Sequence, residues 1–231
     1  MDKSDNKKLK ERLFNIWQSA DFSPFFEKYA KLAHLVKKGT VIFNEGDPLD
    51  KLYFVKKGFV KLYRLSDEGR ESTIYLYGPN SVLGVRALTL EDKTARHYAE
   101  AITDLELTSI EHEKYFDILS SNPEYVIDLL HIFIDRLNYT ERKLEGFILE
   151  DSVARVAYFL SDSVKRFGIQ KGGKYELPLE LTHQRIAEFV GSFRETVTNA
   201  IQKLEKEGVV SINRGKVTIL DIVKLHKYAG L

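Results

Sequence analysis

Residues 181–210 read "LTHQRIAEFVGSFRETVTNAIQKLEKEGVV" and contain two short helical patterns that meet at Gly191. In the first pattern, Thr182 is placed to cap a helix, and Ile186 and Val190 are spaced to face a core. Glycine tolerates the backbone conformation of a tight turn, and "GSF" has the length of the turn that joins the helices of a helix-turn-helix. This stretch constrains the fold most strongly, because two short amphipathic helices with so short a connection must pack against each other.

The second helical pattern separates its apolar side chains from its polar ones. Val197, Ile201 and Leu204 recur at helical spacing and are expected to be buried. The residues expected to point outward lie mostly on its N-terminal half, and they are Arg194, Glu195, Thr198, Asn199 and Lys203. Arginine can donate two hydrogen bonds to guanine, glutamate can accept one from cytosine, and asparagine can pair with adenine. The pattern therefore favours a DNA-reading helix, and the alternative is an ordinary helical hairpin with solvated charges.

The charges are distributed unevenly along the 231 residues. From Ser152 onward there are 13 Lys/Arg and 8 Asp/Glu, a net charge of 13 − 8 = +5. The first 151 residues hold 22 Lys/Arg and 26 Asp/Glu, a net charge of 22 − 26 = −4. A basic C-terminal third is compatible with nucleic acid at that end, although chance clustering of solvated charges gives the same count.

The residue pattern changes along the region that precedes this motif. Residues 7–34 have a helical pattern broken near Pro24. From Val36 to about Tyr115, short runs rich in β-branched and aromatic residues alternate with turn signals such as "EGD", "DEG" and "YGPN". Turns at such short spacing predict a compact antiparallel sandwich or barrel. The glycines at 39, 46, 58, 69, 78 and 84 fall in or beside these breaks, where positive φ angles are expected.

Asn122-Pro123 opens a long helical pattern that continues to residue 150. It carries an apolar stripe of Val126, Leu129, Leu130, Phe133, Leu137, Leu144, Phe147 and Ile148. A stripe of this length predicts a coiled-coil dimer seam, and packing onto the β-rich region is the alternative. We expect the dimer interface to use Val126, Leu130, Phe133, Leu137 and Leu144.

The C-terminal third adds a further helix that ends at Gly168, a turn in "IQKGGKY", a short strand in "YELPLELT", two strands around "NRGK" and a final helix. Helices followed by a β-hairpin are typical of a winged helix-turn-helix domain. The expected fold is therefore α+β, with a β-roll domain at residues 1–121, a dimerisation helix at 122–150 and a DNA-binding domain at 151–231. We place the hinge near Glu150-Asp151.

Taken together, "GTVIFNEGDPLDKLYFVKKGFVKLYRLSDEGRE" and the motif at residues 181–210 resemble the cyclic-AMP receptor protein / fumarate–nitrate regulator (CRP/FNR) family of transcription factors. The resemblance covers about residues 25–220. It implies a homodimer that reads an inverted repeat of double-stranded DNA and cooperates with RNA polymerase in the cytoplasm. It also implies base readers at Arg194 and Glu195, and phosphate contacts at Thr182, Gln184 and Thr196. From their outward positions we add Thr198 and Asn199 to the base readers and Lys203 to the phosphate contacts. Many relatives have an arginine at the place of Asn199.

Cyclic-nucleotide-binding members of this family carry a polar cassette in the β-roll. Gly84 matches its glycine, but Val85 stands at the place of the ribose-binding glutamate, and Ala95-Arg96 stands at the place of an Arg-Ser pair. On a strand, Arg96 would point to the opposite face unless the loop slips. Thr140-Glu141 replaces a Thr-Ser pair on the long helix. We therefore expect little or no binding of cyclic AMP, and an unknown small effector or none in this pocket.

Other functions find less support in the composition. The chain has no cysteine, which excludes disulfides and cysteine-ligated clusters. It has no apolar run long enough for a membrane span and no apolar signal core. Haem could be bound through a histidine. However, no second residue stands at a suitable spacing from any of the candidates His34, His97, His112 and His131. We expect no enzyme activity, no metal and no certain cofactor. The alternatives are a cyclic-nucleotide-binding module that acts through protein partners, and a jelly-roll metal enzyme with His112 as its nearest ligand.

Overall fold

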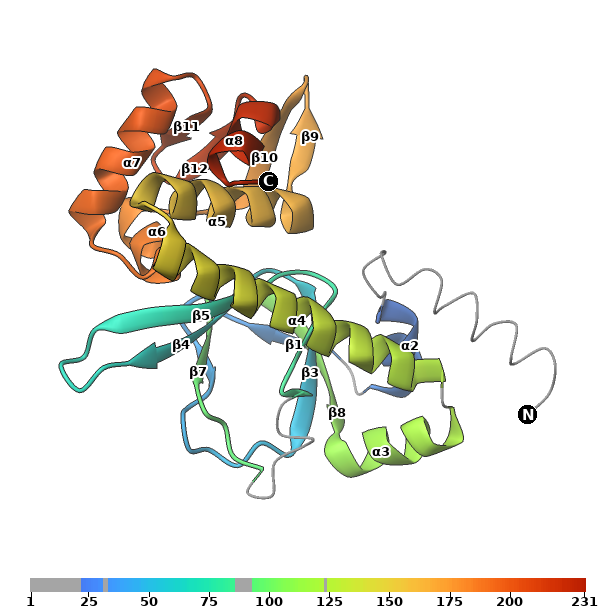
Figure 1. Ribbon diagram of the computed structural model, residues 1–231. Helices are drawn as coiled ribbons and strands as arrows, with labels where there is room; N and C mark the ends of the chain where they lie inside the picture. The colour runs from blue at the N-terminus through green and yellow to red at the C-terminus, as the bar shows by residue number, and fades with distance from the viewer. Residues whose placement is uncertain (1–21, 31–32, 86–92, 123) are drawn as a thin grey trace.

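The computed structural model describes residues 22–30, 33–85, 93–122 and 124–231. Most of the helical pattern expected at residues 7–34 lies outside these ranges. The chain forms two bodies, a β-rich one, which we call the β-roll, and a C-terminal one of helices and strands. The long helix α4 (Glu124–Leu149) crosses the β-roll and leads to the C-terminal body (Figure 1).

The β-rich body consists of two four-stranded antiparallel sheets, which agrees with the fold class expected from the spacing of the turns. One sheet has the order β1-β8-β3-β6 and the other β2-β7-β4-β5, so β5 is an edge strand. The strands are β1 (His34–Val36), β2 (Val41–Phe43), β3 (Lys51–Lys57), β4 (Val60–Leu65), β5 (Glu71–Tyr77), β6 (Ser81–Leu83), β7 (Tyr98–Ala101) and β8 (Leu105–Glu111).

Two apolar cores stabilise this body. The first lies between the sheets and includes Val55, Val60 and Leu83. The second joins β3 to the helices α2 (Ser23–Tyr29), α3 (His112–Ser121) and α4 (Glu124–Leu149). The expectation that the β pattern continues to residue 115 was wrong, because α3 begins at His112. Its apolar residues Tyr115, Ile118 and Leu119 have helical spacing and are buried in the second core.

Helix α4 has two apolar faces. Ile127 is buried, and Leu129, Ile132 and Phe133 pack against the second core. The second face is exposed in the single chain and consists of Val126, Leu130, Ile134, Leu137, Leu144 and Ile148. From Leu130 onward the positions are spaced by four, three, seven and four residues, as in a heptad repeat, and Val126 extends the exposed face by one turn. We expected Phe133 in the dimer seam, but it packs against the second core, and Ile134 takes its place in the exposed stripe.

The C-terminal body has a four-stranded antiparallel sheet of order β11-β12-β10-β9 with helices packed against it. Its elements are α5 (Ser152–Phe167), β9 (Ile169–Lys171), β10 (Lys174–Glu180), α6 (His183–Val190), α7 (Arg194–Lys206), β11 (Val210–Asn213), β12 (Lys216–Ile219) and α8 (Ile222–Tyr228). The segment "IQKGGKY", expected as a turn alone, forms strand β9, the Gly172-Gly173 turn and the start of β10.

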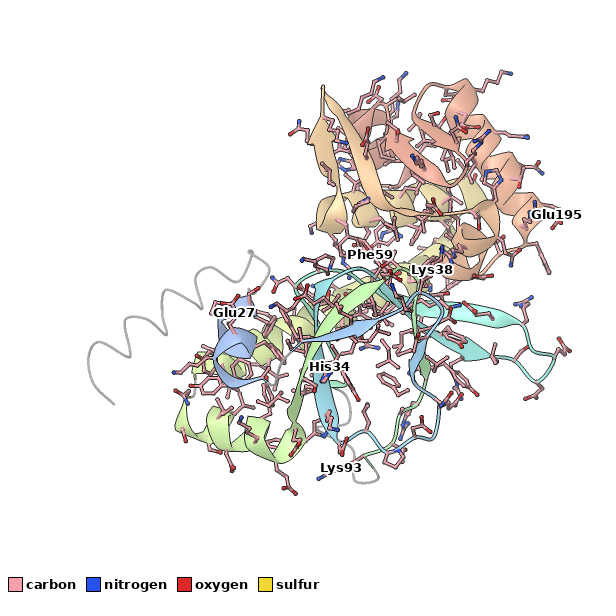
Figure 2. All side chains as sticks on the ribbon, turned by 180° about the vertical axis from the view of Figure 1, so that it is seen from behind. Glu27, His34, Lys38, Phe59, Lys93 and Glu195 are labelled. Atoms are coloured by element: carbon pink, nitrogen blue, oxygen red, sulfur yellow. The ribbon has the colours of Figure 1, made fainter. Side chains whose placement is uncertain are left out.

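The two bodies share a continuous apolar core. Phe59 of the β-roll lies at the junction (Figure 2), and its ring meets the ring of Phe167 edge-on at 5.2 Å between centroids. Gly78 was expected to need a positive φ angle, but its φ is not in that region. A Cβ at this position would collide with the Phe167 ring, so glycine is required for the close approach of α5 to the β-roll.

Candidate nucleic-acid interface and effector cavity

Helices α6 and α7 form the helix-turn-helix, and local hydrogen bonds fix its turn. The Thr182 hydroxyl accepts a hydrogen bond from the Arg185 backbone N–H at 3.2 Å and thereby caps α6. Gly191 ends α6 with φ 60° in the left-handed region, where glycine is favoured. The backbone N–H of Ser192 donates to the Ala187 carbonyl at 3.0 Å. The chain then enters α7 at Arg194 after three residues.

Helix α7 is anchored by one face and exposed on the other. Val197, Ala200, Ile201 and Leu204 are buried in the core shared with α5 and α6. Arg194, Glu195, Asn199 and Lys203 are exposed. Figure 2 shows Glu195 at the outer edge of the C-terminal body, pointing to solvent. Gln202 is also exposed, one turn beyond Asn199, and its amide has the same hydrogen-bonding groups as asparagine. Helical spacing from Glu195 was sufficient to find Gln202, but our sequence analysis did not single it out.

Thr198 is not exposed, although the sequence pattern predicted that it points outward. It is half-buried, and its hydroxyl lies 2.9 Å from the Arg194 carbonyl oxygen and 3.0 Å from His183 Nδ1. The side chain therefore links the first turns of α6 and α7. Thr196 is half-buried as well.

The residues expected near phosphate occupy the ends of the two helices. Thr182 and Gln184 are exposed at the start of α6, where backbone N–H groups favour an anion. The Gln184 amide donates to Glu188 at 2.9 Å. Lys203 lies on α7 with its Nζ 5.6 Å from the centroid of the Tyr228 ring.

The wing carries cations that the sequence analysis did not assign. Arg214 is exposed at the tip of the β11–β12 hairpin with φ 49°, and Gly215 follows with φ 81°. Lys216 is also exposed. The letters "NRGK" contain both cations, so their place at a hairpin tip was available from the sequence.

A cavity in the β-roll lies between the strands and α4. Its volume is about 30 Å³, so the cavity is small. Its described lining contains two guanidinium groups and an imidazole, from Arg96, Arg136 and His97, and no carboxylate. The apolar part of the lining includes Leu62 and Leu83. The described lining thus favours an anion.

Arg96 lines this cavity together with Gly84. Our argument from strand alternation was wrong for Arg96, because β7 begins only at Tyr98 and residues 96 and 97 form a bend. Arg136 of α4 also lines the cavity, and its Nη1 donates to the Tyr77 hydroxyl at 2.5 Å. The sequence analysis missed Arg136, since only the tertiary packing of α4 brings it to the β-roll.

The other three effector candidates are not among the lining residues. Val85 is 4% exposed and belongs to the second core beside Phe54. The Thr140 hydroxyl donates to the Arg136 carbonyl at 2.8 Å, and Glu141 is exposed on α4. The ribose-binding acid of a cyclic-nucleotide site is therefore replaced by a residue of the apolar core.

Of the four histidines weighed for haem, His97 lines the cavity, whereas His34, His112 and His131 are not among its lining residues. In the part of the chain that the structure describes, no group of three or more potential ligands could hold a metal ion. Among the same residues, no helix is long and apolar enough to cross a membrane.

Comparison with known protein families matches both bodies of the chain. Residues 33–122 match the cyclic nucleotide-binding domain, and residues 154–228 match the Crp-like helix-turn-helix domain.

Two similar curated proteins are regulators. The global nitrogen regulator of Nostoc sp. is 35% identical over 192 residues, which is 83% of this chain and 86% of the relative. The CRP-like cAMP-activated global transcriptional regulator of Mycobacterium tuberculosis is 32% identical over 193 residues, which is 83% of this chain and 85% of the relative.

Among solved structures, a CRP/FNR-family transcriptional regulator from Thermus thermophilus superposes with a TM-score of 0.71 at 30% identity. The match covers 86% of this chain and 98% of that one.

Proposed function

The chain belongs to the CRP/FNR family of transcription regulators, and on this premise we propose that it reads an inverted repeat of DNA as a homodimer. The observation that carries the proposal is the exposed N-terminal half of α7. It presents Arg194, Glu195 and Asn199 on a helix whose opposite face is fixed in the core. Recognition helices of helix-turn-helix proteins place this half in the major groove.

The side chains support different roles in this reading. Arg194 can donate two hydrogen bonds to one guanine, and Glu195 can accept from a cytosine. A carboxylate close to the DNA repels phosphate, so Glu195 suits a base contact. Asn199 and Gln202 add amides that suit adenine. Around them, we propose that Thr182, Gln184, Thr196, Lys203 and the wing residue Arg214 contact phosphates.

Dimerisation supplies the second half of the site. The exposed stripe of α4 has the heptad spacing of a two-stranded coiled coil, and a second copy of the chain offers the same stripe. A two-fold axis along α4 relates two α7 helices, which requires an inverted repeat with half-site centres about one helical turn of DNA apart.

We propose that the effector cavity takes a small anion other than cyclic AMP. Arg96 and Arg136 supply the positive charge, while Val85 removes the acid that a ribose needs. Binding changes DNA affinity only if the ligand prefers one of two arrangements of the DNA-binding domain. The helix boundary at Glu150-Asp151 is the proposed hinge, since α4 ends at Leu149 and α5 begins at Ser152.

We further propose that the protein acts in the cytoplasm, contacts RNA polymerase when bound to DNA, and catalyses no reaction. These points follow from the role of a transcription regulator.

The test is selection of bound sequences from a pool of random duplex DNA by the purified full chain. Enrichment of an inverted repeat is expected. A matched control is Arg194→Ala, which should lose the enriched sequence, with Lys174→Ala, an exposed residue at the start of β10, as the neutral variant. A module that acts only through protein partners would enrich no sequence, and that result would contradict the proposal.

A further inference from the structure

The edge strand β5 is held by cationic side chains from α4 and α5. The Nη2 group of Arg166 in α5 donates to the Leu76 carbonyl at 2.7 Å. The Nζ group of Lys143 in α4 donates to the Thr73 carbonyl at 2.9 Å. Because an edge strand pairs on one side only, its backbone is open to side-chain donors, and these two bonds tie it to the helices. Helix α5, the first helix of the DNA-binding domain, is thereby attached to the β-roll.

Tyr75 lies at the centre of this attachment. The guanidinium carbon of Arg166 is 4.6 Å from the centroid of the Tyr75 ring, and that of Arg136 is 5.4 Å from the same ring. The ring of Tyr139 in α4 meets it edge-on at 5.0 Å between centroids. One aromatic ring is therefore in contact with cations from both α4 and α5, an arrangement that favours both cations electrostatically.

The same Arg136 belongs to the effector cavity. It lines the cavity beside Tyr77, and its Nη1 donates to the Tyr77 hydroxyl at 2.5 Å. Tyr77 in turn contacts Tyr75 at 4.7 Å between ring centroids. A path of direct contacts thus runs from the cavity through Arg136 and Tyr75 to Arg166 on α5.

Arg166 also connects this path to the rest of its helix. Its Nη1 lies 3.4 Å from the Asp162 carboxylate, one turn earlier in α5. Both side chains are largely buried, and burial is the main reason that the pKa of Asp162 is raised above its usual value. A buried guanidinium with several partners has few alternative positions, so a shift of the Tyr75 ring must be met by a shift of α5.

We propose that Tyr75 is the positioning residue that couples the effector cavity to the DNA-binding domain. An anion in the cavity competes with Tyr75 and Tyr77 for the Arg136 guanidinium. When Arg136 turns to the ligand, the Tyr75 ring loses one of its two cations, and the contact of Tyr75 with Arg166 rearranges. This proposal rests on the proposed effector response, because it describes how a ligand in the cavity would act on the DNA-binding domain.

The test is a double-mutant cycle that needs no effector. Arg136→Met, Tyr75→Leu and the double variant are compared with the wild type by hydrogen exchange of α5 and by affinity for the selected DNA. Arg136→Met alone is expected to change DNA affinity by about fivefold or more, a typical allosteric coupling. It should also change exchange of the α5 amides. In the Tyr75→Leu background, both effects of Arg136→Met should fall to less than about twofold.

Control variants separate coupling from general damage. Tyr75→Phe keeps the ring and should keep the coupling. Tyr98→Leu removes a different stacked tyrosine of the β-roll, at 5.2 Å from the Tyr63 ring, and should leave the Arg136 effect intact. If Tyr75→Leu does not fold, Arg166→Lys tests the same path, because lysine lacks the planar face that stacks on Tyr75.

Equal effects of Arg136→Met with and without Tyr75 would overturn the proposal, as would no effect of Arg136→Met on α5 exchange. Failure to bind any DNA would instead contradict the proposed function, while the exchange measurement would still decide whether Tyr75 couples Arg136 to α5.

Discussion

Leu137→Ala tests the dimer seam with a change whose size can be estimated from the structure. Leu137 is 56% exposed in the single chain, beside Leu130 and Leu144 on the exposed stripe of α4. Full burial of a leucine side chain contributes about 1.5–3 kcal/mol, so covering the exposed half contributes about 0.8–1.5 kcal/mol. A two-fold interface contains the residue twice, and Leu137→Ala should therefore weaken the dimer by about 1.5–3 kcal/mol.

Since each 1.4 kcal/mol corresponds to a factor of about ten, the dimer dissociation constant should rise by about 10- to 150-fold. Sedimentation equilibrium at several protein concentrations measures this constant directly. Leu35→Ala is the matched control, because Leu35 is 86% exposed on β1 and away from the stripe. Leu137→Asp should give monomers, since it places two carboxylates in the seam. Equal effects of Leu137→Ala and Leu35→Ala, or a wild-type monomer at micromolar concentration, would refute the reasoning.

Three further predictions concern the turn of the helix-turn-helix, the pH dependence of stability and the cavity. Gly191→Ala should lower the free energy of unfolding by about 1–2 kcal/mol, because alanine is strained at φ 60°; a thermal melt that matches the wild type would contradict this. Burial lowers the pKa of Lys143 to about 8, whereas the side chain has a pKa of about 10.4 in the unfolded chain. At a pH between these two values, the unfolded chain therefore binds more protons than the folded one. The wild type should therefore gain stability relative to Lys143→Met as the pH rises from 8 to 10. Denaturant titrations that give the same difference in unfolding free energy between the two proteins at both pH values would disprove it. Calorimetry with cyclic AMP should show no binding near micromolar affinity; such binding would mean that Arg96 does reach the cyclic phosphate.

Local patterns were enough to predict the elements that build the DNA-binding surface. The cap at Thr182, the turn at Gly191 and the buried Val197 all depend on residues within one or two helical turns. The wing around "NRGK" is a hairpin whose signal is equally local. The same holds for the antiparallel sheets, whose turns are marked by glycine.

Features that depend on long-range packing could not be read from the sequence. An apolar stripe does not say which of its residues face the β-roll, and the structure assigns Phe133 to that side and Ile134 to the exposed side. Arg136 reaches the effector cavity only because α4 packs across the β-roll. Gly78 looked like a turn glycine, whereas its role is to admit the ring of Phe167 from a helix almost ninety residues away in sequence.

The central claim is that α7 reads base sequence, and competition gel shifts with Arg194→Ala test it most directly. Each good base contact discriminates by about 1–3 kcal/mol, whereas non-specific binding depends mainly on phosphate contacts. Arg194→Ala should therefore weaken binding to the selected site by about ten- to a hundredfold, with a much smaller loss for random-sequence DNA. Glu195→Ala should relax preference at one base pair per half-site more than it lowers total affinity. An equal loss of specific and random-sequence binding in Arg194→Ala would make Arg194 a phosphate contact and would contradict the assignment of α7 as the reading helix.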